Sequence, residues 1–105
     1  MKSYLKPPPE FRNGFKDKER LAKIHDLACV VCSERGLQQR SKTIAHHKIG
    51  NGLGLKASDR LTIALCEDHH NKTSEGIHEM PLWMWEEKYF TQEELIEMTN
   101  RMLGV

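Results

Sequence analysis

Three cysteines and one histidine are spaced as two pairs of metal ligands. Cys29 and Cys32 form a CxxC pair, and Cys66 and His69 form a second pair with the same two intervening residues. A pair at this spacing can present both side chains to one tetrahedral zinc ion, at about 2.3 Å from each thiolate. The alternative is three buried cysteines without a metal, because free cysteine is among the most buried residue types. The repeated spacing favours one structural Zn²⁺ bound by all four residues.

Four of the six histidines form two further groups, His46 with His47 and His70 with His78, that could bind a metal ion or transfer a proton. His46 and His47 are adjacent, His70 directly follows His69, and His78 lies eight positions beyond His70. A neutral imidazole binds metals and accepts a proton near pH 7. Near the end of a strand, one histidine of a pair can bind a metal while its neighbour addresses a water between metal and substrate. The alternative is that these histidines are core residues whose hydrogen bonds are all made within the protein, around a zinc site that is purely structural.

The elements predicted around these residues have the order strand, loop, strand, helix. We expect a strand over residues 43–49, a glycine-rich loop over 50–54, a second strand over 61–65 and the start of a short helix over 68–73. This order places His46 and His47 at the end of the first strand and His70 on the helix. The sequence therefore predicts a ββα arrangement that brings them together.

Other segments flank this unit. Helices are predicted over 17–27, with Asp17 as N-cap, over 80–90, and from a capping box at Thr91 and Glu94 to Gly104. The CxxC pair is expected to form a knuckle followed by a polar turn at 33–36, and His25 to lie on a helix surface. Four large side chains at helical spacing are expected in the core rather than on a base-stacking surface: Trp83, Met84, Trp85 and Tyr89.

The length of 105 residues fits one small domain. Residues 1–16, which are basic and proline-rich, are expected to be a disordered arm, and residues 17–105 the domain itself. The longest apolar run has six residues, from Leu27 to Cys32, whereas a membrane helix needs about 20. No signal peptide is evident, and an odd number of cysteines argues against a disulfide scaffold. We therefore expect a cytoplasmic protein that does not enter a membrane.

The motifs together resemble the HNH, or ββα-metal, endonucleases. The residues that carry this resemblance are Cys29-x2-Cys32, Ala45-His46-His47, Asp59 and Leu65-Cys66-x2-His69-His70. More narrowly, four segments are similar to the Ref-type recombination-enhancement nucleases of bacteriophages: His46-His47, residues 52–59, residues 65–70 and residues 76–78. The resemblance covers residues 25–97. It implies an α+β fold, a small zinc-stapled ββα-metal (HNH, treble-clef-like) domain with flanking helices.

The resemblance also implies roles for single residues. In such enzymes the residue matched by His46 binds the catalytic metal, and the residue matched by His47 is the general base on the attacking water. His70 matches a further metal ligand, and His78 matches a histidine that can join it. Asp59 stands where the family has the asparagine that braces the loop and orients the base. An aspartate accepts the same hydrogen bonds but has no amide to donate.

The implied cofactors are one structural Zn²⁺ and one catalytic divalent ion, Mg²⁺, Mn²⁺, Zn²⁺ or Ni²⁺. Many relatives have aspartate at the position of His46, and a histidine there favours borderline metals such as Zn, Ni, Co or Mn over Mg. Mg²⁺ that keeps additional waters is the alternative.

The function implied is metal-dependent hydrolysis of DNA with little sequence preference, in phage recombination or DNA processing in the host cytoplasm. The alternative is a catalytically inactive, zinc-stapled DNA-binding or recombination-accessory module. Residues 1–60 carry 13 Lys or Arg and 6 Asp or Glu, which is compatible with a polyanionic partner. Lys48 and Lys56, beside the glycine-rich loop, are candidate phosphate contacts or ordinary surface lysines. Ref-type relatives act with a recombinase filament, so the resemblance suggests one as a partner.

Overall fold

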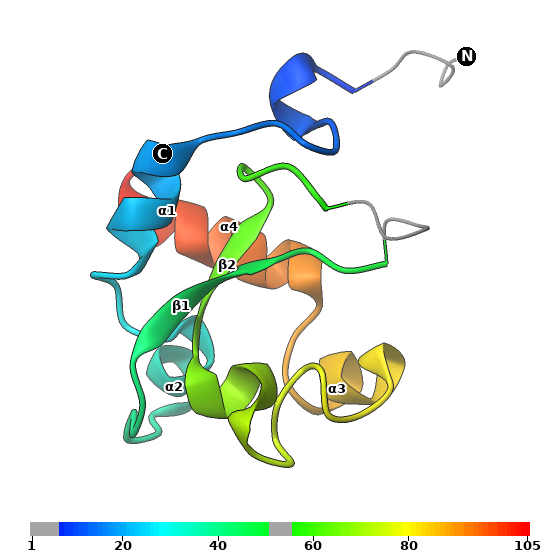
Figure 1. Cartoon of the computed structure of the whole chain (residues 1–105). Coiled ribbons are helices and arrows are strands. Elements are labelled where there is room, and N and C mark those ends of the chain that lie inside the picture. Colours follow the sequence, from blue (N-terminus) through cyan, green and yellow to red (C-terminus); the bar gives the residue numbers. More distant parts are fainter. Residues whose placement is uncertain (1–6, 51–55) are drawn as a thin grey trace.

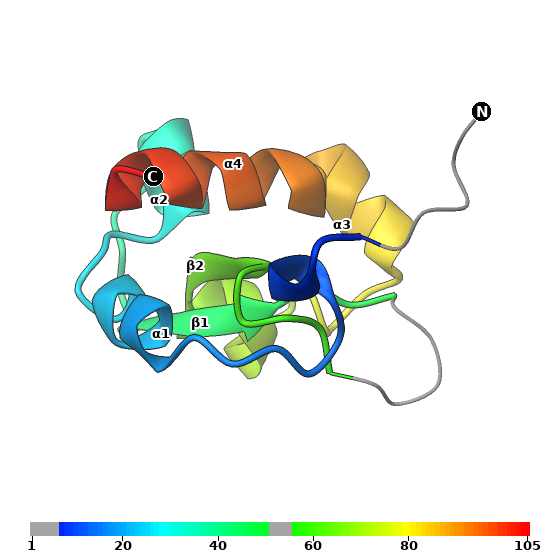
Figure 2. The same ribbon diagram turned by 90° about the horizontal axis from the view of Figure 1, so that it is seen from above.

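The structure, a computed structural model, describes residues 7–50 and 56–105 as a small α+β fold around a two-stranded antiparallel sheet (Figure 1). The elements in chain order are η1 (Pro9–Phe11), α1 (Lys18–Ile24), α2 (Val30–Arg35), β1 (Thr43–His47), β2 (Thr62–Cys66), η2 (Asp68–Lys72), α3 (Leu82–Lys88) and α4 (Gln92–Leu103). The α+β class predicted from the sequence is confirmed. Viewed from above, α4 runs along one face of the sheet, with α1 near its C-terminal end (Figure 2).

The two strands pair in a register that places the histidine pair at one end of the sheet. Thr43 lies opposite Cys66, and His47 lies opposite Thr62. Every residue of β2 is buried, whereas β1 has half-buried positions at its centre and at His47. Both strands were expected from their alternating apolar residues, and each is found within two residues of its predicted bounds.

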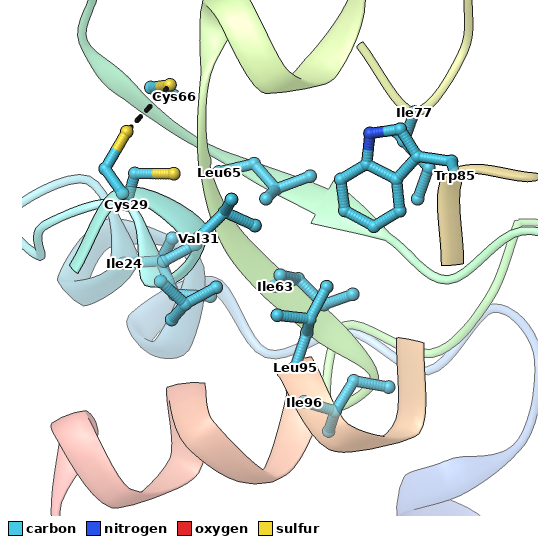
Figure 3. Close-up of a cluster of buried hydrophobic side chains, with 13 residues drawn as sticks. Ile24, Cys29, Val31, Ile63, Leu65, Cys66, Ile77, Trp85, Leu95 and Ile96 are labelled. Atoms are coloured by element: carbon cyan, nitrogen blue, oxygen red, sulfur yellow. Dashed lines mark hydrogen bonds between the residues drawn. The ribbon is translucent and has the colours of Figure 1, made fainter. Parts of the chain in front are cut away.

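The hydrophobic core lies between the sheet and the helices (Figure 3). Side chains from α1, α2, β2 and α4 meet there, and all are at most 8% exposed: Ile24, Val31, Ile63, Leu65, Leu95 and Ile96. Trp85 from α3 and Ile77 lie beside Leu65 and extend the core (Figure 3), and the Trp85 indole Nε1 donates to the carbonyl of Glu75 at 2.8 Å. The core therefore continues directly into the segment that carries the later histidines.

Of the four large side chains expected in the core from residues 80–90, only some are buried. Trp85 is fully buried and Tyr89 packs at the edge of the core, but Trp83 is 65% exposed and Met84 is 44% exposed. Successive residues of an α-helix are about 100° apart, so a short helix on the surface buries only one side. The prediction of a core position is therefore wrong for Trp83 and Met84.

Local structure before the sheet differs from the sequence predictions at α1 and at the CxxC pair. α1 ends at Ile24 instead of continuing to residue 27. The expected knuckle and polar turn form the short helix α2, which ends where Gly36 adopts a left-handed conformation with φ of 65°. Glycine has no Cβ to oppose that conformation, so it closes the helix at low cost. The capping box at Thr91 and Glu94 is present at the start of α4, as predicted.

The N-terminal segment from residue 7 onward contains η1 and contacts the domain, and the disordered arm expected over residues 1–16 stays a prediction. After η1, the backbone N–H of Gly14 donates to Lys56 at 3.0 Å, and that of Asp59 donates to Phe15 at 2.9 Å. These hydrogen bonds hold the segment beside residues 56–59. Residues 1–6, and residues 51–54 of the predicted glycine-rich loop, lie outside the described residues.

Within the described residues, no helix is long and apolar enough to cross a membrane.

A buried arginine connects the first helix to the sheet and the last helix. Arg20 is 6% exposed. Its guanidinium donates to the Thr62 hydroxyl at 2.7 Å, to the Thr62 carbonyl at 2.8 Å and to the Asn100 side chain at 2.7 Å. Hydrogen bonds from a charged donor are stronger than neutral ones, and buried acceptors that lose them are left unsatisfied. Arg20 is therefore a structural residue.

We expect Arg20→Met to lower the free energy of unfolding by about 2–4 kcal/mol, because it removes three hydrogen bonds and leaves the buried Thr62 carbonyl unpaired. The measurement is urea denaturation followed by circular dichroism. Lys23→Met on the same helix is the matched control, since the Lys23 side chain is 62% exposed and is paired with the exposed Glu19 at 3.8 Å. Equal stabilities of the two variants would contradict the structural role of Arg20.

Candidate metal centres

The first candidate centre is a buried cluster of Cys29, Cys32, Cys66 and His69, in which all four ligand atoms lie within 4.8 Å of one another. His69 Nδ1 lies 3.8, 3.6 and 3.2 Å from the sulfurs of Cys29, Cys32 and Cys66 respectively. Ligands bound to one tetrahedral zinc are separated by about 3.5–3.8 Å. The four residues predicted from their spacing thus form one cluster that could hold a metal ion.

Three elements build this cluster. Cys29 is the N-cap of α2 and Cys32 lies within that helix, Cys66 ends β2, and His69 lies on η2. The Gln39 side chain accepts a hydrogen bond from the backbone of Cys29 at 2.8 Å, which holds the start of α2 in place.

The electrostatics of this cluster suit a cation. Burial raises the pKa of the Cys29 thiol and of the Cys32 thiol, and the Cys66 sulfur adds to both shifts; for Cys29, backbone hydrogen bonds from Cys32 and Cys66 oppose the increase without cancelling it. Burial lowers the pKa of His69, which keeps its imidazole in the neutral form that binds metals. A bound divalent cation deprotonates coordinating thiols and offsets the cost of burying their charge. The donor set of three sulfurs and one imidazole fits zinc.

The second candidate centre consists of His46, His70 and His78, whose ligand atoms also lie within 4.8 Å of one another. The ring centroids are 5.3 Å apart for His46 and His70, 5.1 Å for His46 and His78, and 4.6 Å for His70 and His78. Burial lowers the pKa of His46 to about 3 and also lowers the pKa of His70; repulsion between protonated imidazoles adds to both shifts. Neutral imidazoles that face one another can share a metal ion.

Backbone hydrogen bonds bring His70 and His78 together. Ile77 donates to the carbonyl of His69 at 2.8 Å, and His78 donates to the carbonyl of His70 at 3.0 Å. Gly76 precedes this pairing, and a Cβ atom there would lie 2.6 Å from the His70 carbonyl oxygen. That distance is shorter than any normal contact, so the close approach of the two segments requires glycine at position 76.

His47 directly follows His46 on β1 and is paired with Asp59. His47 Nε2 lies 2.7 Å from Asp59 Oδ1, and Asp59 Oδ2 accepts the backbone N–H of Asp17 at 2.8 Å. Burial alone raises the pKa of Asp59, but the hydrogen bonds from Asp17 and His47 and the His47 charge outweigh it, so its net pKa is lowered. The carboxylate is therefore ionised and accepts from His47 Nε2–H. The other nitrogen, Nδ1, remains able to accept a proton.

The two candidate phosphate contacts, Lys48 and Lys56, and the histidine predicted on a helix surface, His25, lie outside both clusters. Lys48 forms an ion pair with Glu93 on α4 at 2.9 Å. The Lys56 side chain is exposed, and its carbonyl accepts the hydrogen bond from Gly14. His25 caps α1, and its Nδ1 lies 3.1 Å from the Thr43 carbonyl, so it belongs to neither candidate centre.

Sequence reasoning does not identify Gln92, the first residue of α4, which is only 2% exposed. Its side-chain oxygen lies 3.2 Å from Nε2 of His46. Glutamine in the first turn of an amphipathic helix is ordinarily a solvent-exposed residue, so no local pattern distinguishes this one.

A family model described as "Protein of unknown function (DUF968)" matches residues 2–104. The chain belongs to the DUF968 family. The match includes every residue of both candidate centres of this DUF968 member. Neither a curated protein nor a solved structure matches the chain. Because the family description names no activity, the chemistry of the two clusters is what bears on function.

We expect the purified chain to retain about one zinc ion after dialysis against metal-free buffer, because three thiolates and an imidazole bind Zn²⁺ tightly. His69→Ala should lose this ion and much of its folded signal, whereas His25→Ala should keep both. The measurements are metal analysis by mass spectrometry and circular dichroism before and after addition of a strong chelator. A wild-type chain that stays fully folded without metal would contradict the assignment.

We expect Gly76→Ala to lower the free energy of unfolding by about 1–3 kcal/mol, because the added Cβ overlaps the backbone of His70. It should also weaken Ni²⁺ binding at the second centre, since His70 and His78 move apart. Calorimetric titration of the zinc-loaded protein measures this binding. Gly104→Ala is the control: its positive φ of 82° makes alanine unfavourable, but open space surrounds it, and Ni²⁺ affinity should not change.

Proposed function

We propose that this protein is a metal-dependent endonuclease of the ββα-metal (HNH) class that hydrolyses DNA phosphodiester bonds with little sequence preference. The observation that carries the proposal is that His47, paired with Asp59, directly follows His46 of the cluster of His46, His70 and His78 on the same strand. His46 and His47 are consecutive residues at the end of β1, so a base and a metal ligand are held by the same strand. This combination suits hydrolysis by an activated water.

Phosphodiester hydrolysis requires an activated water, a Lewis acid at a nonbridging oxygen and stabilisation of the leaving oxygen. A divalent ion held by His46, His70 and His78 would supply the Lewis acid and stabilise the leaving 3′ oxygen, whose bond to phosphorus breaks as the water attacks. His47 takes the proton from water at Nδ1, because Nε2–H is already donated to Asp59. The Asp59 carboxylate holds the ring in this orientation and stabilises the imidazolium that forms.

The choice of metal follows from the donor set. Three imidazole nitrogens without a carboxylate favour borderline ions such as Zn²⁺, Ni²⁺, Co²⁺ or Mn²⁺ over Mg²⁺. The other cluster, with its three sulfurs, has the donors of a structural zinc site and no position for a substrate, because all four of its residues are buried. The two centres therefore have separate roles in the proposal.

The choice of DNA as substrate rests on charge and on the motifs. His47, Asp59 and most of the basic residues lie within residues 1–60. This segment has 13 Lys or Arg and only 6 Asp or Glu. Such an excess of positive charge attracts a polyanion. The segments similar to Ref-type nucleases, including residues 76–78, extend the proposal to phage recombination in the host cytoplasm, with a recombinase filament as partner.

We expect supercoiled plasmid to be nicked in the presence of at least one of Mg²⁺, Mn²⁺, Zn²⁺ or Ni²⁺. His47→Ala should lower the rate by about 10²–10⁴-fold, the usual contribution of a general base. His25→Ala is the matched control and should cleave at the wild-type rate. Gel electrophoresis of the plasmid over time measures both, with and without a recombinase filament.

Two results would refute parts of this proposal. Cleavage at the wild-type rate by His47→Ala would exclude His47 as the base. An absence of cleavage with every metal, together with salt-dependent DNA binding, would favour the catalytically inactive DNA-binding or recombination-accessory module.

A further inference from the structure

The Gln92 side chain is held in one orientation by the backbone of Ile49. Gln92 Oε1 accepts the Ile49 N–H at 3.0 Å, and Gln92 Nε2 donates to the Ile49 carbonyl at 3.0 Å. A backbone N–H can only donate and a backbone carbonyl can only accept, so the oxygen and nitrogen of the amide cannot be exchanged. The backbone N–H of Gln92 in turn donates to the Glu86 carboxylate at 2.8 Å, which fixes the start of α4.

This fixed orientation determines which nitrogen of His46 carries hydrogen. Gln92 Oε1 also lies 3.2 Å from His46 Nε2, in a buried environment in which His46 is 1% exposed. A carbonyl oxygen has no proton to give, so His46 Nε2 must be the donor. A neutral imidazole has one N–H, and therefore the lone pair of His46 lies on Nδ1.

We propose that Gln92 is a positioning residue for the cluster of His46, His70 and His78, and that it selects Nδ1 of His46 as the metal-binding atom. The inference rests on the proposed metal site of that cluster. Histidines that bind metals commonly donate their other N–H to an oxygen, which sets the tautomer and the ring orientation. Here the oxygen comes from the C-terminal helix, 46 positions along the chain from the ligand.

The same amide also connects His46 to the segment that leaves β1. Ile49 is three residues beyond His46, and both are bound by one side-chain oxygen of Gln92. A purely structural role would need only the two hydrogen bonds to Ile49. A positioning role also needs the acceptor that faces His46, and two substitutions separate these roles.

Gln92→Glu keeps an acceptor for Ile49 N–H and for His46 Nε2–H, and loses the donor to the Ile49 carbonyl. Gln92→Met has a similar length and loses every side-chain hydrogen bond. If Gln92 positions His46, the glutamate variant should bind Ni²⁺ much as wild type does, and the methionine variant should bind it about 10–100-fold more weakly. If Gln92 is only structural, both variants lose stability and neither changes Ni²⁺ affinity.

The control for stability is Thr99→Val on the same helix. Thr99 is fully buried, and its hydroxyl accepts the N–H of Ala64 at 3.2 Å. Removing this hydroxyl weakens the attachment of α4 to β2 and leaves the hydrogen bond between Gln92 and His46 in place. Thr99→Val should unfold more readily than wild type and bind Ni²⁺ with unchanged affinity.

The experiment uses the full zinc-loaded chain labelled with ¹⁵N-histidine, with the His46 signals assigned by comparison with His46→Ala. Two-bond ¹H–¹⁵N spectra should show His46 as the Nε2–H tautomer in wild type and Gln92→Glu, and as a mixture in Gln92→Met. Titration with Ni²⁺, followed by calorimetry, should give the order of affinities stated above.

A wild-type His46 protonated on Nδ1, or an unchanged Ni²⁺ affinity in folded Gln92→Met, would overturn the proposal. If Gln92→Met does not fold, the tautomer of His46 in wild type decides it. Neither measurement involves DNA. If the tautomer and the Ni²⁺ affinities are as predicted but no plasmid is cleaved, the role of Gln92 stands and the nuclease function is refuted.

Discussion

The position of η2 is the constraint on which both candidate centres depend. Two consecutive residues of this short turn serve different clusters, His69 with the three cysteines and His70 with His46 and His78. A five-residue turn has too few hydrogen bonds of its own to be stable in isolation. Its place is set by the backbone pairing with Ile77 and His78 and by the close approach at Gly76. A zinc ion at His69 would therefore also hold His70 in position.

α4 links the core to the second centre by polar contacts made from buried positions. Gln92 at its start contacts His46, Thr99 in its middle binds the backbone of β2, and Asn100 near its end accepts from Arg20. Among the described residues, no buried side-chain nitrogen or oxygen lacks a hydrogen-bond partner. In a domain with a small core, such satisfied contacts specify one arrangement of helix and sheet. The geometry of the histidine cluster thus depends on a helix that contributes no metal ligand.

The features predictable from sequence are those that local spacing encodes. The pairs at 29 and 32 and at 66 and 69, the adjacent histidines, both strands and the capping box of α4 are each visible within a few residues. The contacts of His46 with Gln92, and of residues 14 and 15 with residues 56 and 59, join distant parts of the chain. They depend on how the elements pack, and neither residue type nor periodicity marks them. The exposed position of Trp83 has the same origin, since helical spacing does not say which side faces the core.

The environments of His46 and His47 differ because neighbouring residues on a strand face opposite sides. His46 faces the buried side, where burial keeps it neutral and its hydrogen bond to Gln92 is to an uncharged amide. His47 is half-buried and its partner is the Asp59 carboxylate, which stabilises a positive charge on the ring. A metal ligand must stay unprotonated, whereas a general base must gain a proton during the reaction. The strand turns one side chain toward an amide and the other toward a carboxylate, and these two environments match the roles proposed for His46 as a metal ligand and for His47 as the general base.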